Sequence, residues 1–119
     1  MAKITLVRVP NLFAGGALTL SATPPIGLAY LAASVREAGH DVALIDALGE
    51  NTENVYPFRG NLYINGLTIP EILAAVPPDS EYIGVSLAFS HEWPLSKQVC
   101  VALAERFPNA VIIVGGEHA

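Results

Sequence analysis

Residues 26–47, IGLAYLAASVREAGHDVALIDA, place a helix, a stop signal and a strand in direct succession. Residues 23–25, TPP, precede this stretch with a capping hydroxyl and prolines, which the first turn of a helix tolerates. Gly39 suits the left-handed residue that commonly follows a helix. Residues 41–47 form a near-continuous apolar run, which is typical of a strand buried on both faces. The stretch therefore predicts a helix over 26–38 followed by a strand over 41–47.

Three further apolar runs predict strands of the same kind. Residues 4–9 supply the first, residues 82–88 (YIGVSLA) the second and residues 110–116 (AVIIVGG) the third. Apolar residues at helical spacing over 95–107 predict a helix between the last two of these strands. Buried parallel strands that alternate with helices indicate an α/β fold, a doubly wound and mostly parallel sheet of flavodoxin-like type.

Two connecting segments are predicted to be loops. Residues 10–23 follow the first strand, and residues 48–67, LGENTENVYPFRGNLYINGL, form a polar and aromatic insert after the second strand. The insert leaves the carboxyl end of the sheet, where folds of this type bind ligands. Thr68 and Glu71 then form a capping-box pattern for a short helix that ends before Pro77.

The predicted sheet ends with an apolar strand that has no further strand beside it. An exposed apolar edge invites pairing with other chains. We therefore expect residues 1–119 to be one domain, incomplete after its fourth strand and belonging to a longer protein. We also expect self-association through this edge, exchange of segments between chains, or a companion polypeptide that supplies the missing strand.

Composition excludes several classes of protein. Hydrophobic residues make up 52% of the 119 residues and charged residues 14%, against a usual charged share of about 25%. Such a chain buries enough apolar surface to fold, so it is not disordered. The net charge is −5 and no basic cluster is present, which argues against nucleic acid or an anionic membrane as a partner. A single cysteine, Cys100, excludes a disulfide framework.

No Asp, Glu, Lys, Arg or His occurs between Val9 and Val35. A membrane span needs roughly 20 mostly apolar residues in a row, and prolines, glycines and Asn11 interrupt this one. The uncharged segment is therefore interpreted as a loop and a helix covered by the domain itself or by a large, mostly apolar ligand.

The chain lacks the familiar phosphate-binding and hydrolase motifs. It has no GxGxxG after the first strand, no GxxxxGK[ST] and no GxSxG. What remains is a set of small and hydroxyl-bearing residues at the carboxyl ends of the strands and at the start of the first helix, where a flat, uncharged arm of a bulky ligand could approach the backbone. The set comprises Thr23, Pro25, Gly27, Ser86, Ser90, Gly115 and Gly116.

Together, residues 23–47, residues 82–90 (YIGVSLAFS) and residues 111–119 (VIIVGGEHA) resemble the N-terminal cobalamin-binding domain of B12-dependent radical S-adenosylmethionine enzymes. Cobalamin-binding domains more widely carry a Ser-x-Leu motif and a Gly-Gly pair; Ser86 and Gly115-Gly116 match these, whereas Ala88 departs from the usual Leu. The wider group also has Asp-x-His-x-x-Gly after the first strand. This chain has no His before His40, so it resembles the subgroup whose cobalt has no protein histidine ligand.

The resemblance implies a cofactor domain that binds cobalamin base-off, with the dimethylbenzimidazole tail in the crevice lined by the small residues. The corrin would lie over the loops after the first two strands, with Pro10, Asn11 and His118 as further contacts. Asp46 would either accept a corrin amide or cap a loop. No residue is assigned to catalysis or to a metal.

The same resemblance implies a cytoplasmic methyltransferase, or another enzyme that uses a radical and B12 together, whose radical portion lies outside this chain. In the resembling enzymes, that portion carries a [4Fe-4S] cluster and S-adenosylmethionine. The cluster motif CxxxCxxC is absent here, so the resemblance places both groups outside this chain. Two alternatives stay open: a flavodoxin-like docking or regulatory domain that binds no B12, and a free-standing enzyme with another cofactor.

The glycine pair at the end of the last strand gives a testable expectation. We expect Gly116→Val to weaken ligand binding far more than it lowers the stability of the fold.

Overall fold

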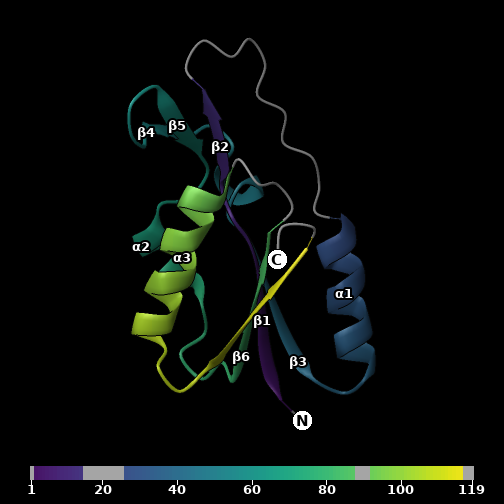
Figure 1. Cartoon of the computed structure of the whole chain (residues 1–119). Coiled ribbons are helices and arrows are strands. Elements are labelled where there is room, and N and C mark those ends of the chain that lie inside the picture. Colours follow the sequence, from purple (N-terminus) through teal and green to yellow (C-terminus); the bar gives the residue numbers. More distant parts are fainter. Residues whose placement is uncertain (1, 15–25, 88–91, 117–119) are drawn as a thin grey trace.

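A computed structural model describes residues 2–14, 26–87 and 92–116 of the chain (Figure 1). The helices and strands follow one another as β1 (Lys3–Arg8), β2 (Asn11–Ala14), α1 (Ile26–Glu37), β3 (Asp41–Asp46), a short 3-10 turn η1 (Gly49–Asn51), β4 (Val55–Pro57), β5 (Leu62–Asn65), α2 (Ile69–Ala75), β6 (Tyr82–Ser86), α3 (Trp93–Arg106) and β7 (Val111–Gly115). None of the helices in the described ranges is long and apolar enough to cross a membrane.

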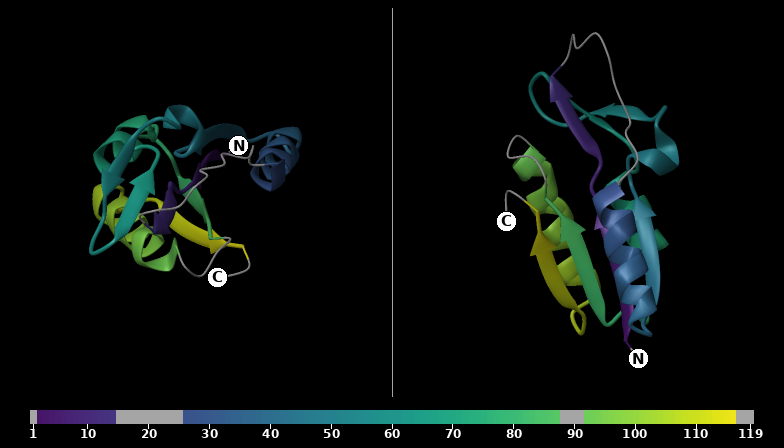
Figure 2. Two further views of the ribbon diagram at one scale, coloured as in Figure 1. Left: turned by 90° about the horizontal axis from the view of Figure 1, so that it is seen from above. Right: turned by 90° about the vertical axis from the view of Figure 1, so that its right-hand side faces the viewer.

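The main sheet contains four parallel strands in the order β3-β1-β6-β7. Helix α1 lies against one face, whereas α2 and α3 cover the other face (Figures 1 and 2). Helices on both faces of a parallel sheet confirm the predicted doubly wound, flavodoxin-like fold.

The predicted loops contain a second, smaller sheet. Strands β2, β5 and β4 pair antiparallel in the order β2-β5-β4, so parts of 10–23 and 48–67 are strands that pair with each other. Leu12 and Ile64 point into the core, and the rings of Phe13 and Tyr63 stack with centroids 6.0 Å apart. The predictions of loops were wrong at these positions, because strands of three or four residues leave no readable alternation in the sequence.

Backbone hydrogen bonds fix the small sheet over the carboxyl ends of β1 and β3. The Leu67 amide donates to the Ala47 carbonyl at 2.7 Å, and the Ala47 amide donates to the Arg8 carbonyl at 3.0 Å. The Tyr56 hydroxyl donates to the Leu67 carbonyl at 3.0 Å. Burial, followed by the charge of Glu71, raises the pKa of Tyr56, so its phenol stays protonated as this donor.

The two faces of the main sheet differ in packing. Side chains from alternate positions of β1, β6 and β7 meet α2 and α3 on the packed face, which includes Thr5, Val7, Ile83 and Ile112 (Figure 1). The remaining positions form the open face, which comprises Ile4, Leu6, Gly84, Ser86, Ile113 and Gly115. Only one face therefore belongs to the continuous core, although the apolar runs had predicted burial on both.

The signals for helix ends are confirmed. Gly39 has a φ of +95°, and the amides of Gly39 and His40 donate to the carbonyls of Arg36 and Val35 at 3.0 and 3.3 Å. This pair of bonds is a Schellman motif that closes α1. At the start of α2, Thr68 and Glu71 form the predicted reciprocal capping box.

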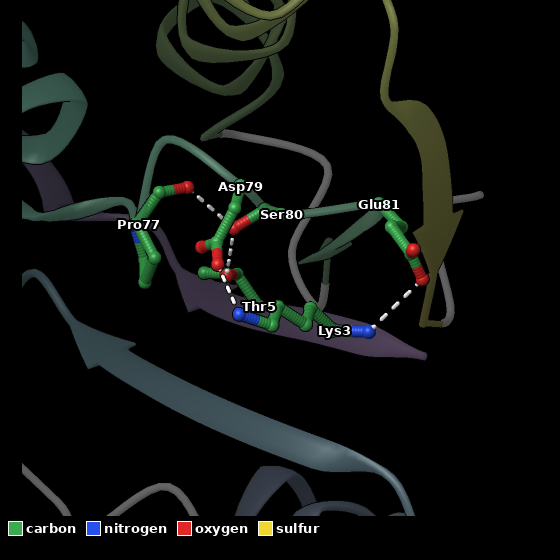
Figure 3. Close-up of polar contacts among 6 residues, drawn as sticks. All are labelled: Lys3, Thr5, Pro77, Asp79, Ser80 and Glu81. Atoms are coloured by element: carbon green, nitrogen blue, oxygen red, sulfur yellow. Dashed lines mark hydrogen bonds and ion pairs between the residues drawn. The ribbon is translucent and has the colours of Figure 1, made fainter. Parts of the chain in front are cut away.

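A polar cluster closes the amino end of the sheet (Figure 3). The Ser80 hydroxyl donates to the Pro77 carbonyl at 2.7 Å and lies 2.7 Å from the Thr5 hydroxyl, which is then its donor. The Lys3 ammonium pairs with Asp79 nearby. These contacts fasten the connection between α2 and β6 to β1, and they lie at the opposite end from the predicted site.

Candidate functional site

An apolar cleft of about 720 Å³ lies between α1 and the open face of the main sheet. Its walls come from β1, β6 and β7 on one side and from α1 on the other. The lining residues are Ala2, Ile4, Leu6, Gly27, Leu28, Leu31, Val35, His40, Tyr82, Gly84, Val85, Ser86, Ile113, Gly115 and Gly116. No Asp, Glu, Lys or Arg is among these lining residues.

The register of the parallel strands orders the sheet wall into rows. Leu6, Gly84 and Ile113 lie side by side at mid-height. Ser86 and Gly115 form the next row, at the carboxyl edge. Rows two residues apart are separated by about 6.6 Å, so the cleft extends down from the carboxyl edge across the sheet.

The helical wall is an apolar stripe with little protein against it. Leu28, Leu31 and Val35 recur at helical spacing and line the cleft, whereas Ala32 is the buried residue of α1. Leu31 remains 49% exposed. Such an apolar stripe is typical of a helix that packs on a core. In the described part of the chain, this stripe borders the cleft instead.

Glycines leave the cleft its width. A Cβ added to Gly115 would have no atom within 4 Å and would project into open space. A Cβ on Gly84 would lie 2.9 Å from Leu6 Cδ2, so a side chain there would crowd the middle row. An isolated glycine within a strand commonly marks close approach of another group to the backbone, and this signal at Gly84 could have identified it from the sequence.

The polar side chains that line the cleft in the described part of the chain lie at its two ends. Ser86 lies at the carboxyl edge, whereas Tyr82 and His40 lie toward the amino end. The Ala2 amide donates to His40 Nδ1 at 2.9 Å, so that nitrogen is already engaged. The middle of the cleft is apolar.

The structure brings together four of the predicted site residues in this cleft: Gly27, Ser86, Gly115 and Gly116. Others lie elsewhere. Pro10 is buried, and Asn11 begins β2; neither lines the cleft. Thr23, Pro25, Ser90 and His118 lie outside the described residues.

Of the two interpretations of Asp46, the structure shows a loop cap. Asp46 Oδ1 accepts the Gly49 amide at 2.9 Å and lies 3.5 Å from Arg8 Nε. The carboxylate thus closes the turn after β3, a common role for aspartate beside an exposed amide.

Gly116 corrects an expectation. Its φ is +111°, and a Cβ there would lie 2.8 Å from the carbonyl carbon of Leu87. A β-branched side chain would therefore strain the backbone itself, and Gly116→Val must damage the fold, contrary to the sequence-based expectation. Gly115 is the position where a side chain would fill the cleft and spare the backbone.

No cluster of three or more His, Cys, Asp or Glu side chains able to hold a metal ion occurs in the described ranges. Cys100 packs on α3 beside the core, and burial raises the pKa of its thiol. Cys100 is therefore a protonated, half-buried thiol that serves as a small core residue.

Comparison with known proteins assigns a family. The family model described as B12 binding domain matches residues 15–119. The anaerobic magnesium-protoporphyrin IX monomethyl ester cyclase of Synechocystis sp. is 30% identical over 115 residues, which cover 96% of this chain and 20% of that protein. The cytidylyl-2-hydroxyethylphosphonate methyltransferase of Streptomyces wedmorensis is 29% identical over 102 residues, covering 82% of this chain and 19% of that protein.

The chain therefore spans about a fifth of the length of these relatives. No solved structure matches it significantly. The family match confirms the resemblance to a cobalamin-binding domain that residues 23–47, 82–90 and 111–119 had indicated.

Proposed function

This chain belongs to the B12-binding domain family, and we propose that its apolar cleft receives the nucleotide tail of cobalamin, with the corrin over the carboxyl edge of the main sheet. The observation that carries the proposal is the cleft itself, about 720 Å³ in volume and open beside Ser86 and Gly115. An uncharged cleft bordered by a helix and strand ends is where folds of this class take a bulky ligand.

The residues present fit the group. The dimethylbenzimidazole of the tail is flat and apolar, and the glycines at 84 and 115 leave room for a ring beside the strands. The Ser86 hydroxyl can pair with a ring nitrogen at the carboxyl edge. The uncharged segment over 9–35 suits a corrin whose rim carries neutral amides. When bound, cobalamin supplies a cobalt centre for methyl transfer or related chemistry, and this chain orients and shields it.

We further propose base-off binding without a histidine ligand to cobalt. The sequence between Val9 and Val35, which connects β1 to α1, contains no His. His40 lies toward the amino end of the cleft and accepts the Ala2 amide. Reduced Co(II)-cobalamin bound to the protein should give an electron paramagnetic resonance spectrum without nitrogen hyperfine splitting from an axial ligand. Splitting from an imidazole nitrogen would contradict this part of the proposal.

We propose that the wider role of this chain is that of the cofactor domain in a longer B12-dependent radical S-adenosylmethionine enzyme. The type of enzyme that we propose is a methyltransferase. Support comes from the relatives, one of which is named a methyltransferase and both of which are about five times as long as the aligned segment. The cluster and S-adenosylmethionine would then be bound by sequence beyond these residues, since Cys100 is the single cysteine here. A longer form of the protein should bind a cysteine-ligated [4Fe-4S] cluster and cleave S-adenosylmethionine; failure of both would contradict this role.

Retention of colour tests cobalamin binding itself. Protein incubated with hydroxocobalamin and then dialysed should keep a stoichiometric visible absorbance. A colourless protein would favour the alternative of a docking domain without B12. Gly115→Val serves as the matched control, because the added side chain occupies the cleft while the backbone at this position needs no unusual φ.

A further inference from the structure

We infer that the cleft selects the base of the tail, accepting a cobamide with a benzimidazole base and discriminating against one with a purine base. The inference rests on the proposed function, because it assumes that the tail enters this cleft. It adds the chemical class of ligand that the cleft distinguishes.

Within ranges 26–87 and 92–116 and the first strand, the part of the cleft next to its carboxyl edge is bordered mainly by apolar groups. Below Ser86, a base meets the row of Leu6, Gly84 and Ile113 on the sheet side. On the helix side it meets Leu28 and Leu31. Because strand rows two residues apart are about 6.6 Å apart, a bicyclic ring entering beside Ser86 spans this apolar row.

Among the residues that the structure describes, few polar side chains lie near that row. Ser86 contributes one hydroxyl at the carboxyl edge, while Tyr82 and His40 lie beyond the apolar row toward the amino end. His40 Nδ1 already accepts the Ala2 amide at 2.9 Å. No carboxylate, ammonium or guanidinium group is among the lining residues.

This distribution suits one base and not the other. A dimethylbenzimidazole released from cobalt has a single free ring nitrogen, which one hydroxyl satisfies, and its two methyl groups add apolar contact. An adenine adds an exocyclic amine and further ring nitrogens, which would leave water for an apolar row without gaining partners. Polar groups left unpaired in this way weaken binding by roughly ten- to a hundredfold.

Three corrinoids test the inference by equilibrium dialysis: cobalamin, the adenine-containing cobamide and cobinamide, which has no nucleotide tail. We expect cobalamin to bind about tenfold or more tightly than the adenine cobamide. We expect cobinamide also to bind more weakly than cobalamin, because it has no tail to occupy the cleft.

The outcomes separate the two proposals. If the adenine cobamide and cobalamin bind equally while cobinamide binds weakly, the tail occupies the cleft but the selectivity is refuted. If cobinamide binds as tightly as cobalamin, or none of the three binds, the tail site is refuted and the selectivity with it.

A matched pair of variants on α1 links selectivity to the cleft wall. Leu31→Gln places an amide on the helical wall of the cleft. It should lower the ratio of the affinity for cobalamin to that for the adenine cobamide, because the purine gains a hydrogen-bond partner. Tyr30→Gln, one residue away and 73% exposed, lies outside the lining and should leave the preference unchanged. Equal ratios of affinity in Leu31→Gln and the unsubstituted protein would contradict the role of this wall.

Discussion

The packed face and the open face of the main sheet come from the same strands, but their side chains differ in burial. On the packed face, Ile83 and Leu103 are fully buried between the sheet and α3. On the open face, Ile113 is 52% exposed and Leu31 is 49% exposed across the cleft. Alternate residues of one strand thus have two surroundings: one set forms the core, and the other borders the cleft.

The two long helices also differ in how far their apolar side chains are buried. Helix α3, of 14 residues, buries Leu95, Val99 and Leu103 at helical spacing. Helix α1, of 12 residues, buries Ala32, and its larger apolar side chains border the cleft. Apolar surface that the fold leaves uncovered is costly in water, and a ligand that covers it stabilises the folded state.

The largest expected difference between the faces is in stability. Leu103→Ala should lower the free energy of unfolding by about 3 kcal/mol, because it opens a cavity in the packed core. Leu31→Ala should lower it by no more than about 0.5 kcal/mol, because that side chain is half exposed. Urea unfolding of both variants without cobalamin measures the contrast. Similar losses for the two leucines would show that α1 packs as α3 does.

The adjacent glycines at the end of β7 should separate fold from binding. Gly116→Ala should destabilise the protein by about 1–3 kcal/mol, since the φ of +111° is unfavourable for alanine and its Cβ would meet Leu87. Gly115→Val should change stability by less than about 1 kcal/mol and weaken cobalamin binding by about tenfold or more.

Thermal unfolding and equilibrium dialysis on both glycine variants check this expectation. An unchanged affinity in a folded Gly115→Val protein would remove the carboxyl edge of β7 from the site.

The smallest expected effect lies on the packed side, at the capping box of α2. Hydrogen bonds from the Thr68 amide and then its hydroxyl hold the pKa of Glu71 below its usual 4.5. Since the folded pKa is the lower one, this contribution is complete above pH 4.5 and disappears as the pH falls through the folded value. Thr68→Ala should lower stability by about 1 kcal/mol at neutral pH, and the difference should shrink in acid.

Unfolding of Thr68→Ala at several pH values, beside dialysis with cobalamin at neutral pH, measures both parts. The affinity for cobalamin should be unchanged because α2 lies on the packed side. A difference in stability that is constant from neutral to acid pH would contradict the capping role of Glu71.

The sequence predicted the main sheet well because its strands are near-continuous apolar runs and its helices carry explicit end signals such as Gly39 and Thr68. It did not predict the β2-β5-β4 sheet, whose strands have three or four residues. Strand β5 pairs with β4 close by in the sequence, but its pairing with β2 joins segments about 50 residues apart, which local pattern does not encode.

The residues that line the candidate cleft were predicted in part, for a related reason. Small residues at strand ends, such as Ser86 and Gly115, stand out in a sequence and were identified. Leu28 and Leu31 were missed, because an apolar helical stripe is indistinguishable in sequence from one that packs in the core. Only the spacing between α1 and the sheet shows that this stripe borders a cleft.

Methyl-resolved NMR during titration with cobalamin tests most directly whether the open face is the ligand site. Methyl signals of Leu28, Leu31 and Ile113 should shift strongly, because these groups line the cleft. Those of Val99 and Leu103, buried on the opposite side of the sheet, should move little. Shifts centred on Val99 and Leu103, or no shifts in the cleft at saturating cobalamin, would contradict the assignment of the open face to the ligand.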